Sequence, residues 1–321
     1  MKKERVAFNS GGETCVGVLT RPKGVSGPLP LVIMAGGWCY VKEMVLPYYA
    51  EYFDSIGFAT LQFDYRNDGE SSGEPRQHLN PWAQIEDYRN ALSFAESHDD
   101  IDASRTGIWG ISYAGGHVLV VSAIDPRPKF AISVVPVIDG FQTMRRVHGE
   151  ARFAELRRVI MADRRSRFEG NPGGYIPMSS LKPFEEVCSW PMADCFEVFH
   201  DIKAREAPNH QHRNTIESVE LFTQYDVIPF CKRILDTQVL FTAAKGDRNT
   251  SADLQIQAFN EIPNPKKAFE VFDVTHMSIY YDMEDLGKMA QVQADWLRSN
   301  FGAQAAASST SRRVRAPVPA E

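Results

Sequence analysis

The sequence predicts an α/β fold in which a mostly parallel central sheet is flanked by helices and carries a helical insertion. Three observations predict this fold. Largely apolar runs, such as 31–35 and 130–138, alternate with amphipathic helical stretches, as is typical of parallel strands buried on both faces. The alternation stops over 139–236 and resumes at 238–244. Within 110–116, a serine stands among glycines where an apolar strand leads into a helix.

The composition is that of an ordinary globular protein. Of the 321 residues, 43% are hydrophobic and 24% are charged, which suits one large domain or a core with an insertion. A net charge of −6, spread along the chain, speaks against a nucleic-acid partner, and no apolar run is long enough to span a membrane. The five cysteines are scattered, and no secretion signal follows the charged start. We therefore expect reduced thiols and a cytoplasmic location.

The first part of the chain predicts an antiparallel edge pair followed by repeated strand–helix units. The β-prone runs 5–8 and 15–20 flank the turn residues 9–12, which predicts two antiparallel strands. The elements expected next are a strand at 31–35, a helix ending near Gly57, a strand at 58–65, a helix at 82–97, a strand ending before Ser112, the helix after it, and a strand at 130–138. Such alternation needs crossover connections and therefore parallel strands.

Residues 139–236 are predicted to form a mostly helical cap over a discontinuous core made of 1–138 and 237–302. The segment is charged and interrupted, with basic helical stretches and a Gly/Pro loop. It is also rich in aromatic residues. Those such as Trp190 and Phe184 either bind an apolar substrate or form the hydrophobic core of the cap itself.

The last part of the chain completes the predicted sheet. Strands at 238–244 and 268–272 enclose a helix at 254–259, and an amphipathic helix covering 283–297 follows. The Ala/Ser-rich residues 303–321, with their arginine cluster, predict a disordered tail.

Ser112 is the candidate nucleophile within 110–116, which we interpret as the pattern G-x-S-x-G. A nucleophile on a sharp strand-to-helix turn has a strained backbone, and small flanking residues avoid collisions with the neighbouring strand and helix. The N-terminus of the following helix favours negative charge beside the serine. Since such a pattern arises by chance in about one chain in ten of this length, the rest of the chain must supply a base and an acid.

His276 and Asp247 are the candidate base and acid. A serine hydroxyl needs a base to become a good nucleophile, and the base needs an acidic partner that fixes its tautomer. In a parallel sheet these groups lie at the carboxyl ends of strands, where the serine turn also lies. Asp247 follows the strand at 238–244, and His276 follows the strand at 268–272. The order Ser, Asp, His along the chain matches a known arrangement of such a triad.

Other acids and histidines are weaker candidates. Asp236 precedes its strand at the wrong end of the sheet, Asp226 lies in the insertion, and Asp273 is a local alternative close to the candidate base. His117 lies one helical turn after the serine, which favours a packing or helix-surface position. We therefore prefer Asp247 as the acid.

No metal site is predicted. His210 and His212, together with His200, lack a carboxylate or cysteine at ligand spacing, so we expect them on a solvated surface. The run 179–182 matches S-x-x-K, but its partner motifs S-D-N and K-T-G are absent from the sequence.

Two backbone N–H groups are expected to bind the oxyanion that forms during acyl transfer. One belongs to Tyr113, the residue after the nucleophile. The other belongs to Trp38, with Cys39 as the alternative, because Gly36–Gly37 at the end of the strand 31–35 leave room for the backbone to approach.

From Leu31 to His276 the chain resembles the α/β-hydrolase superfamily. The segment 106–116 is similar to the serine segment of the X-Pro dipeptidyl-peptidase and cocaine-esterase group, and 63–71 resembles the D-x-R-G-x-G-x-S loop found there. The run 35–43 parallels the A-H-G-x-G-G-x-K-E run of a dienelactone-hydrolase-like group that includes polyketide acyltransferases and thiohydrolases.

The chain departs from these groups at two points. The X-Pro dipeptidyl-peptidase and cocaine-esterase group carries a C-terminal jelly-roll domain, for which this chain leaves no room. Some members of these groups have a His-Gly pair at the oxyanion strand, where this chain has Gly36–Gly37. We expect this difference to change how the acyl group is placed.

The residues and the resemblance together predict a serine hydrolase, an esterase or thioesterase that cleaves a carboxylic ester, lactone or thioester through an acyl-enzyme. We expect no metal or organic cofactor, a small-molecule substrate with an apolar or aromatic acyl group, and a homodimer as one oligomeric state. The alternatives are acyl transfer to an alcohol or amine, C–C bond hydrolysis and, less favoured, peptide hydrolysis. The presence of all three triad positions argues against a non-enzymatic binding module.

Overall fold

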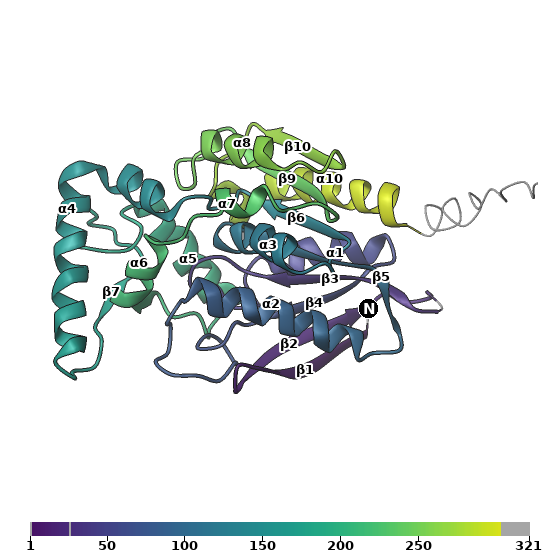
Figure 1. Cartoon of the computed structure of the whole chain (residues 1–321), viewed down its shortest axis with the longest axis horizontal. Coiled ribbons are helices and arrows are strands. Elements are labelled where there is room, and N and C mark those ends of the chain that lie inside the picture. The colour runs from purple at the N-terminus through teal and green to yellow at the C-terminus, as the bar shows by residue number, and fades with distance from the viewer. Residues whose placement is uncertain (1, 26, 303–321) are drawn as a thin grey trace, which may run out of the picture.

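An eight-stranded sheet forms the centre of the protein (Figure 1), with the spatial order β1-β2-β4-β3-β5-β6-β9-β10. The computed structural model describes residues 2–25 and 27–302, so the predicted tail at 303–321 lies outside the described residues. The strands of the sheet are β1 (Lys2–Ser10), β2 (Glu13–Arg21), β3 (Leu29–Ala35), β4 (Ala59–Phe63), β5 (Ile101–Ile111), β6 (Phe130–Val134), β9 (Gln238–Ala244) and β10 (Lys267–Phe272). β2 pairs antiparallel with β1 and β4, and the other neighbours are parallel. The predicted mostly parallel sheet is confirmed.

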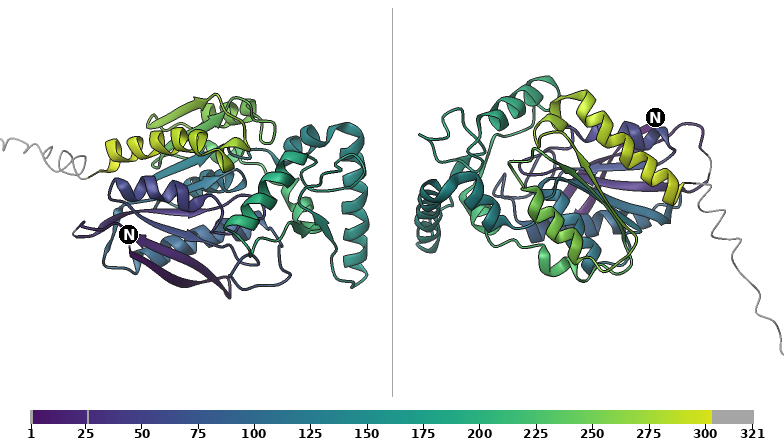
Figure 2. Two further views of the ribbon diagram at one scale, coloured as in Figure 1. Left: turned by 180° about the vertical axis from the view of Figure 1, so that it is seen from behind. Right: turned by 90° about the horizontal axis from the view of Figure 1, so that it is seen from above.

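Helices cover both faces of this sheet (Figures 1 and 2). Those of the core are α1 (Leu46–Ser55), α2 (Pro81–Glu96), α3 (Tyr113–Ile124), α8 (Ala252–Glu261), the short α9 (Ser278–Tyr281) and α10 (Met283–Phe301). On one face α1 packs against α10, whereas α2, α3 and α8 lie on the other. In the part of the chain that the structure describes, no helix is both long and apolar enough to cross a lipid bilayer.

The central strands are apolar because both of their faces are covered. Every residue of β3, β4 and β6 is buried. β5 begins earlier than its apolar run suggests, because residues 102–105, of which three are polar, also belong to the strand although they are partly or fully exposed. The carboxyl ends of the parallel strands therefore form one buried edge, from which the candidate site is built.

The insertion leaves the core after β6 and covers the carboxyl ends of the strands (Figure 1). It contains α4 (Gly140–Phe168), β7 (Tyr175–Pro177), α5 (Ala193–Arg205), β8 (Arg213–Thr215) and α6 (Ile216–Phe222). The antiparallel pair β7–β8 was not expected from the sequence. The backbones of Asp139 and Asp226 form an isolated antiparallel β-bridge where the two ends of the insertion meet. The next helix, α7 (Ile228–Cys231), packs against α3 and α8, so the chain rejoins the core before the expected boundary at 236.

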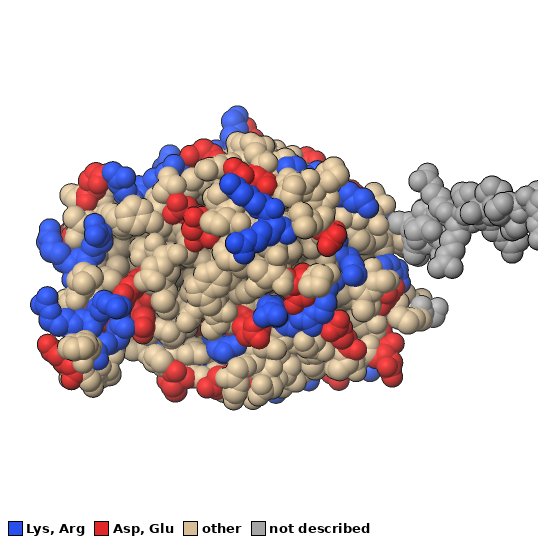
Figure 3. Space-filling view, viewed as in Figure 1, with Lys and Arg blue, Asp and Glu red and all other residues tan. Residues whose placement is uncertain are grey.

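α4 is the outermost helix of the insertion. Gly149 has φ 67° and ψ 167°, so α4 consists of two helical pieces joined at this residue. Charged side chains of both signs are scattered over the face in Figure 3, and the Lys and Arg side chains at its left end lie over α4. Arg167 forms ion pairs with Glu217 and Glu220, and these pairs attach α4 to α6.

His117 is buried in the core rather than placed on a helix surface. Its Nδ1 lies 3.0 Å from the Tyr225 hydroxyl, and its Nε2 lies 2.9 Å from Gln84 Oε1. Burial lowers the pKa of His117 to about 3, which keeps the ring neutral. Of the two positions considered for His117, packing is therefore the one that the structure has.

A buried ion cluster joins the loops that follow β3 and β4. Lys42 Nζ lies 2.8 Å from Asp64 Oδ2 and 2.6 Å from Glu70 Oε2, while Asp64 Oδ1 accepts a 2.6 Å hydrogen bond from the Lys42 backbone. Burial opposes the charge on Lys42, but the surrounding carboxylates outweigh it and raise the pKa of the ammonium group. The two segments 35–43 and 63–71, noted separately for their family resemblance, are thus held together by this cluster.

We expect Asp68 to make the folded state less stable as the pH rises. Burial, followed by the charge of Asp64, raises the pKa of Asp68 from 3.8 to about 7. The folded state therefore keeps a proton that the unfolded state loses, and stability falls by on the order of 2–4 kcal/mol between about pH 4 and pH 8. Asp68→Asn should flatten this dependence in urea unfolding at pH 5 and pH 8. The exposed Asp273→Asn is the control, and an unchanged pH dependence in Asp68→Asn would contradict the assignment.

Candidate active site

Ser112 lies on the sharp turn between β5 and α3. Its φ of 59° and ψ of −115° place it in a region that residues with a side chain seldom adopt, as expected for a strained turn at the end of a strand. A Cβ on Gly110 would lie 2.3 Å from the Ala114 carbonyl oxygen, so only glycine fits there. The second glycine of the pattern G-x-S-x-G is Ala114 in this chain, a correction to our interpretation of 110–116; Ala114 lies in α3, where a Cβ is tolerated.

Asp247 and His276 come together at the carboxyl ends of β9 and β10. Asp247 Oδ2 lies 3.0 Å from His276 Nδ1, and both side chains are almost completely buried. Asp247 Oδ1 accepts 2.8 Å hydrogen bonds from the backbone N–H groups of Asn249 and Thr250, and Oδ2 accepts one of 2.6 Å from Thr250 Oγ1. Burial opposes ionisation of Asp247, but His276 and these hydrogen bonds outweigh it and hold its pKa below the usual value.

The other acids considered from the sequence lie elsewhere. Asp273 has a side chain that is 89% exposed and lies 4.0 Å from Lys245 Nζ. Asp236 is exposed ahead of β9, and Asp226 belongs to the bridge at the base of the insertion. Among the acids weighed, Asp247 is the one that the structure places against the His276 ring.

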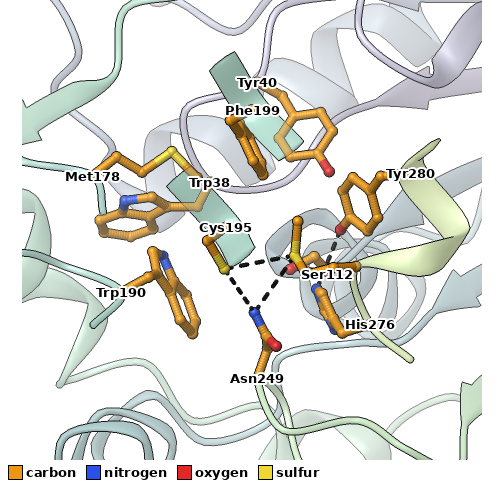
Figure 4. A pocket seen from close by; sticks show the side chains of 11 residues that line it. Trp38, Tyr40, Ser112, Met178, Trp190, Cys195, Phe199, Asn249, His276 and Tyr280 are labelled. Carbon is orange, nitrogen blue, oxygen red and sulfur yellow. Dashed lines mark hydrogen bonds between the residues drawn. The ribbon is translucent and has the colours of Figure 1, made fainter. Parts of the chain in front are cut away.

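Tyr280 contacts the second nitrogen of His276, which sequence reasoning missed. The Tyr280 hydroxyl lies 3.2 Å from His276 Nε2 (Figure 4). Because Nδ1–H is donated to Asp247, Nε2 is the acceptor of the hydrogen bond from the Tyr280 hydroxyl. Ser112, which was expected to act on Nε2, lines the same pocket. His276 lies in the turn before α9 and Tyr280 lies in that short helix, so no periodic pattern in the sequence points to this contact.

The loop after β3 lies directly beside Ser112. A Cβ on Gly37 would lie 3.0 Å from Ser112 Cβ and 3.4 Å from the Tyr113 backbone nitrogen, so the close approach of this loop favours a glycine. Tyr113 is the first residue of α3, and its N–H has no acceptor within the helix. Trp38 and Cys39 follow Gly37, and the Trp38 and Tyr113 rings lie 5.3 Å apart. These are the residues expected to supply the oxyanion N–H groups.

The insertion holds the Trp38–Cys39 loop in place. Trp38 Nε1 donates a 3.0 Å hydrogen bond to Asn214 Oδ1, which also accepts one of 2.8 Å from Ser189. The Cys39 carbonyl accepts a 2.9 Å hydrogen bond from His210 Nδ1. Asn214 is completely buried, so its amide is fixed by these partners.

His210 and His212 are therefore not on a solvated surface, and that expectation was wrong. His210 is fully buried, and its Nε2 lies 3.2 Å from His212 Nδ1, while His212 Nε2 lies 2.7 Å from Ser179 Oγ. Burial lowers the pKa of His210 to about 4 and that of His212 to about 3. In the described residues, no group of three or more His, Cys, Asp or Glu side chains is arranged to hold a metal ion.

A small pocket with a cavity volume of about 20 Å³ lies over Ser112 and His276 (Figure 4). It is lined by Trp38, Tyr40, Ser112, Met178, Trp190, Cys195, Phe199, Asn249, His276, Met277 and Tyr280. Trp190 thus lies where a substrate would bind, whereas Phe184 is 88% exposed and outside the pocket. The expectation that Phe184 contacts the substrate is therefore not supported by its position.

Residues 16–176 match the X-Pro dipeptidyl-peptidase family, S15, over half of the chain. The chain belongs to this family. A thiohydrolase of Eupenicillium brefeldianum is 28% identical over 85% of this chain and 87% of the relative. The polyketide transferase claH of Penicillium crustosum is 25% identical over 93% of this chain and 98% of the relative. The quorum-quenching protein AidA of Acinetobacter baumannii is 42% identical over 43% of this chain, and the match spans 45% of that relative's length.

Comparison with solved structures shows that this chain has the α/β-hydrolase fold. The structure of DcsB in complex with its substrate analogue superposes with a TM-score of 0.79 at 24% identity, covering 93% of this chain and all of DcsB. The α/β hydrolase GrgF from Penicillium sp. sh18 gives a TM-score of 0.77 at 22% identity, covering 93% and 99%. The predictions of an α/β-hydrolase fold and of a hydrolase enzyme are confirmed.

Proposed function

We propose that this chain is a serine hydrolase that cleaves a carboxylic ester, thioester or lactone through Ser112, His276 and Asp247. The observation that carries the proposal is the 3.0 Å Asp247–His276 contact beside a pocket that Ser112 also lines. A strained serine, a buried imidazole and an ionised carboxylate at the carboxyl ends of parallel strands of one sheet are the groups that such acyl transfer needs.

The proposed reaction has two steps. His276 Nε2 takes the Ser112 proton while Oγ attacks the substrate carbonyl, which requires the Tyr280 hydroxyl to leave Nε2. The Tyr113 and Trp38 N–H groups stabilise the oxyanion, and His276 returns the proton to the leaving alcohol, thiol or lactone oxygen. Water then loses a proton to His276, attacks the acyl-enzyme and releases the acid and free Ser112. Asp247 stabilises the imidazolium formed in each step.

The walls of the pocket support an ester-type substrate over an X-Pro dipeptide. A dipeptide with a free N-terminus carries an ammonium group, whose burial needs a carboxylate partner. Among the described residues that line the pocket, none is an aspartate, glutamate, lysine or arginine. An uncharged acyl group suits these walls better.

Acyl transfer is the second candidate function. It is favoured by the similarity to the polyketide transferase claH. The same three residues would act, with an alcohol or amine in place of water. C–C hydrolysis, in which His276 would act first on the substrate, has no specific observation in its favour.

A substrate panel tests the proposal. We would incubate the protein with the p-nitrophenyl ester and a thioester of hexanoic acid, a six-carbon lactone and an X-Pro p-nitroanilide, each with and without an added alcohol. Turnover of the esters or thioester without the alcohol is expected. Turnover that requires the alcohol would favour the transferase, and cleavage of the anilide alone would overturn the ester assignment.

We expect Asn214→Ala to lower kcat by about tenfold with a smaller change in KM. The substitution leaves the Trp38 indole N–H and the Ser189 hydroxyl without their shared acceptor, so the oxyanion loop loses its fixed position. Asn264→Ala is the matched control, because Asn264 is also buried and its amide donates to the Thr237 carbonyl at the start of β9. Equal kcat values for the two variants would contradict a role of Asn214 in positioning the loop.

A further inference from the structure

Three hydrogen-bond donors line the pocket without an oxygen or nitrogen acceptor. They are the side-chain amide of Asn249, the hydroxyl of Tyr40 and the indole N–H of Trp190. These side chains are 6%, 3% and 4% exposed. Buried donors are almost always paired in folded proteins, so three unsatisfied donors around one pocket indicate acceptors that arrive with the ligand.

The Asn249 amide makes only weak contacts within the protein. Its Nδ2 lies 3.4 Å from Cys195 Sγ and 3.9 Å from Met277 Sδ (Figure 4). Thiol and thioether sulfur atoms are poor acceptors, so an oxygen of a bound molecule would replace them at a net gain. The Asn249 backbone N–H is bound to Asp247 Oδ1, which fixes the amide on the same turn as the candidate acid.

Tyr40 and Trp190 approach the pocket from the core and from the insertion. The Tyr40 ring packs against Phe199 and Tyr280, with ring centres 5.3 and 5.5 Å apart, and its hydroxyl has no partner in the described residues. Trp190 packs edge-on against Trp38, and its Nε1 likewise has no partner among the described residues. Because these rings are packed on their sides, they cannot turn freely to find another acceptor.

The rest of the pocket wall excludes charge. Met178, Cys195, Phe199 and Met277 are apolar, and the reacting carbonyl oxygen is already assigned to backbone N–H groups. An uncharged ligand that is apolar over most of its surface and carries further acceptor oxygens satisfies both the walls and the three donors.

Resting on the proposed function, we propose that the acyl group cleaved here bears acceptor oxygens beyond the reacting carbonyl. A ketone oxygen fits this need, because each of the three groups has an N–H or O–H to donate and a ketone accepts without bringing a proton of its own. Asn249 is the main anchor, with Tyr40 and Trp190 as further donors. These residues determine specificity and do not take part in bond cleavage.

Matched thioesters test this inference. We would measure kcat/KM for the thioesters of hexanoic acid and of 3-oxo-, 4-oxo- and 5-oxohexanoic acid, subtracting spontaneous hydrolysis. The ratio of the best oxo substrate to the hexanoyl substrate is expected to be about tenfold or more in the wild type. Asn249→Leu, which keeps the branched shape and the number of heavy atoms but removes the amide oxygen and nitrogen, should bring this ratio close to one.

Two further variants keep the test decisive. Tyr40→Phe removes only a hydroxyl and should lower the ratio for at least one oxo position, even if Asn249→Leu does not fold. Ser122→Ala, on the far part of α3, should retain the wild-type ratio. Oxo and plain thioesters cleaved equally well by the wild type, or a ratio that survives in both pocket variants, would overturn the inference while leaving the serine hydrolase intact. Failure to cleave any thioester or ester would instead overturn the proposed function.

Discussion

Replacing Ser112 with alanine will reduce turnover of the best ester or thioester by at least about 10⁴-fold, because no other group at the turn can form the acyl-enzyme. The substitution removes a single oxygen atom, and we expect the residues around the turn to keep its strained backbone conformation. A fluorophosphonate probe should label the wild type at Ser112 and leave the variant unlabelled, with the mass increase localised by peptide mapping.

Ser122→Ala is the matched control for this result. Ser122 lies on the same helix, and its hydroxyl donates to the Val118 carbonyl rather than facing the pocket. Its loss should leave turnover and labelling within about twofold of the wild type, since the Ser122 hydroxyl is bound to the backbone of its own helix and lines no part of the pocket. Equal turnover by Ser112→Ala and the wild type would remove the serine from the mechanism.

The sequence was sufficient for the sheet and for the relative placement of Asp247 and His276. Apolar runs identify parallel strands, and residues that follow such strands meet at one edge of the sheet. The sequence alone therefore predicts that Asp247 lies near His276. Excluding Asp273 as the acid, in contrast, requires the structure. Its 89% exposed side chain is visible only in the folded chain.

The contacts made by the insertion were beyond sequence reasoning. Trp38 and Asn214 are separated by 176 residues, and no local pattern in the insertion points to the loop that Asn214 holds. His210 was expected in solvent because no carboxylate or cysteine stands at ligand spacing from it, but its packing under Cys39 buries it. Tertiary packing overrides a local preference of this kind.

The lining of the pocket shows the same limit in a second way. Asn249 follows Asp247 by two residues and is not among the candidate residues of the sequence analysis, because its amide reaches the pocket only through the fold that places it beside Cys195 and Met277. Trp190, by contrast, was one of the aromatic residues proposed from composition, and it lies on the pocket wall. Composition thus indicated the apolar character of the site, while the positions of its polar groups depended on the fold.

Replacing Asp247 with asparagine should lower kcat by about 10⁴-fold while leaving the fold in place. Oδ1 accepts two backbone N–H groups at 2.8 Å, from Asn249 and Thr250, so an asparagine would keep its oxygen there. Its NH₂ group would then face His276 Nδ1, and the imidazole would have to carry its proton on Nε2. A protonated Nε2 cannot accept the Ser112 proton, so the nucleophile would lose its base.

Asp273→Asn separates this effect from a general loss of carboxylate charge near His276. Asp273 is exposed and pairs only loosely with Lys245, so its replacement should keep kcat within about twofold of the wild type. Steady-state kinetics on both variants, with circular dichroism to compare their folding, distinguishes the two acids. A large loss in Asp273→Asn together with retained turnover in Asp247→Asn would transfer the role to Asp273. Comparable losses in both would mean that the charge of the whole loop region, rather than the tautomer of His276, controls the reaction.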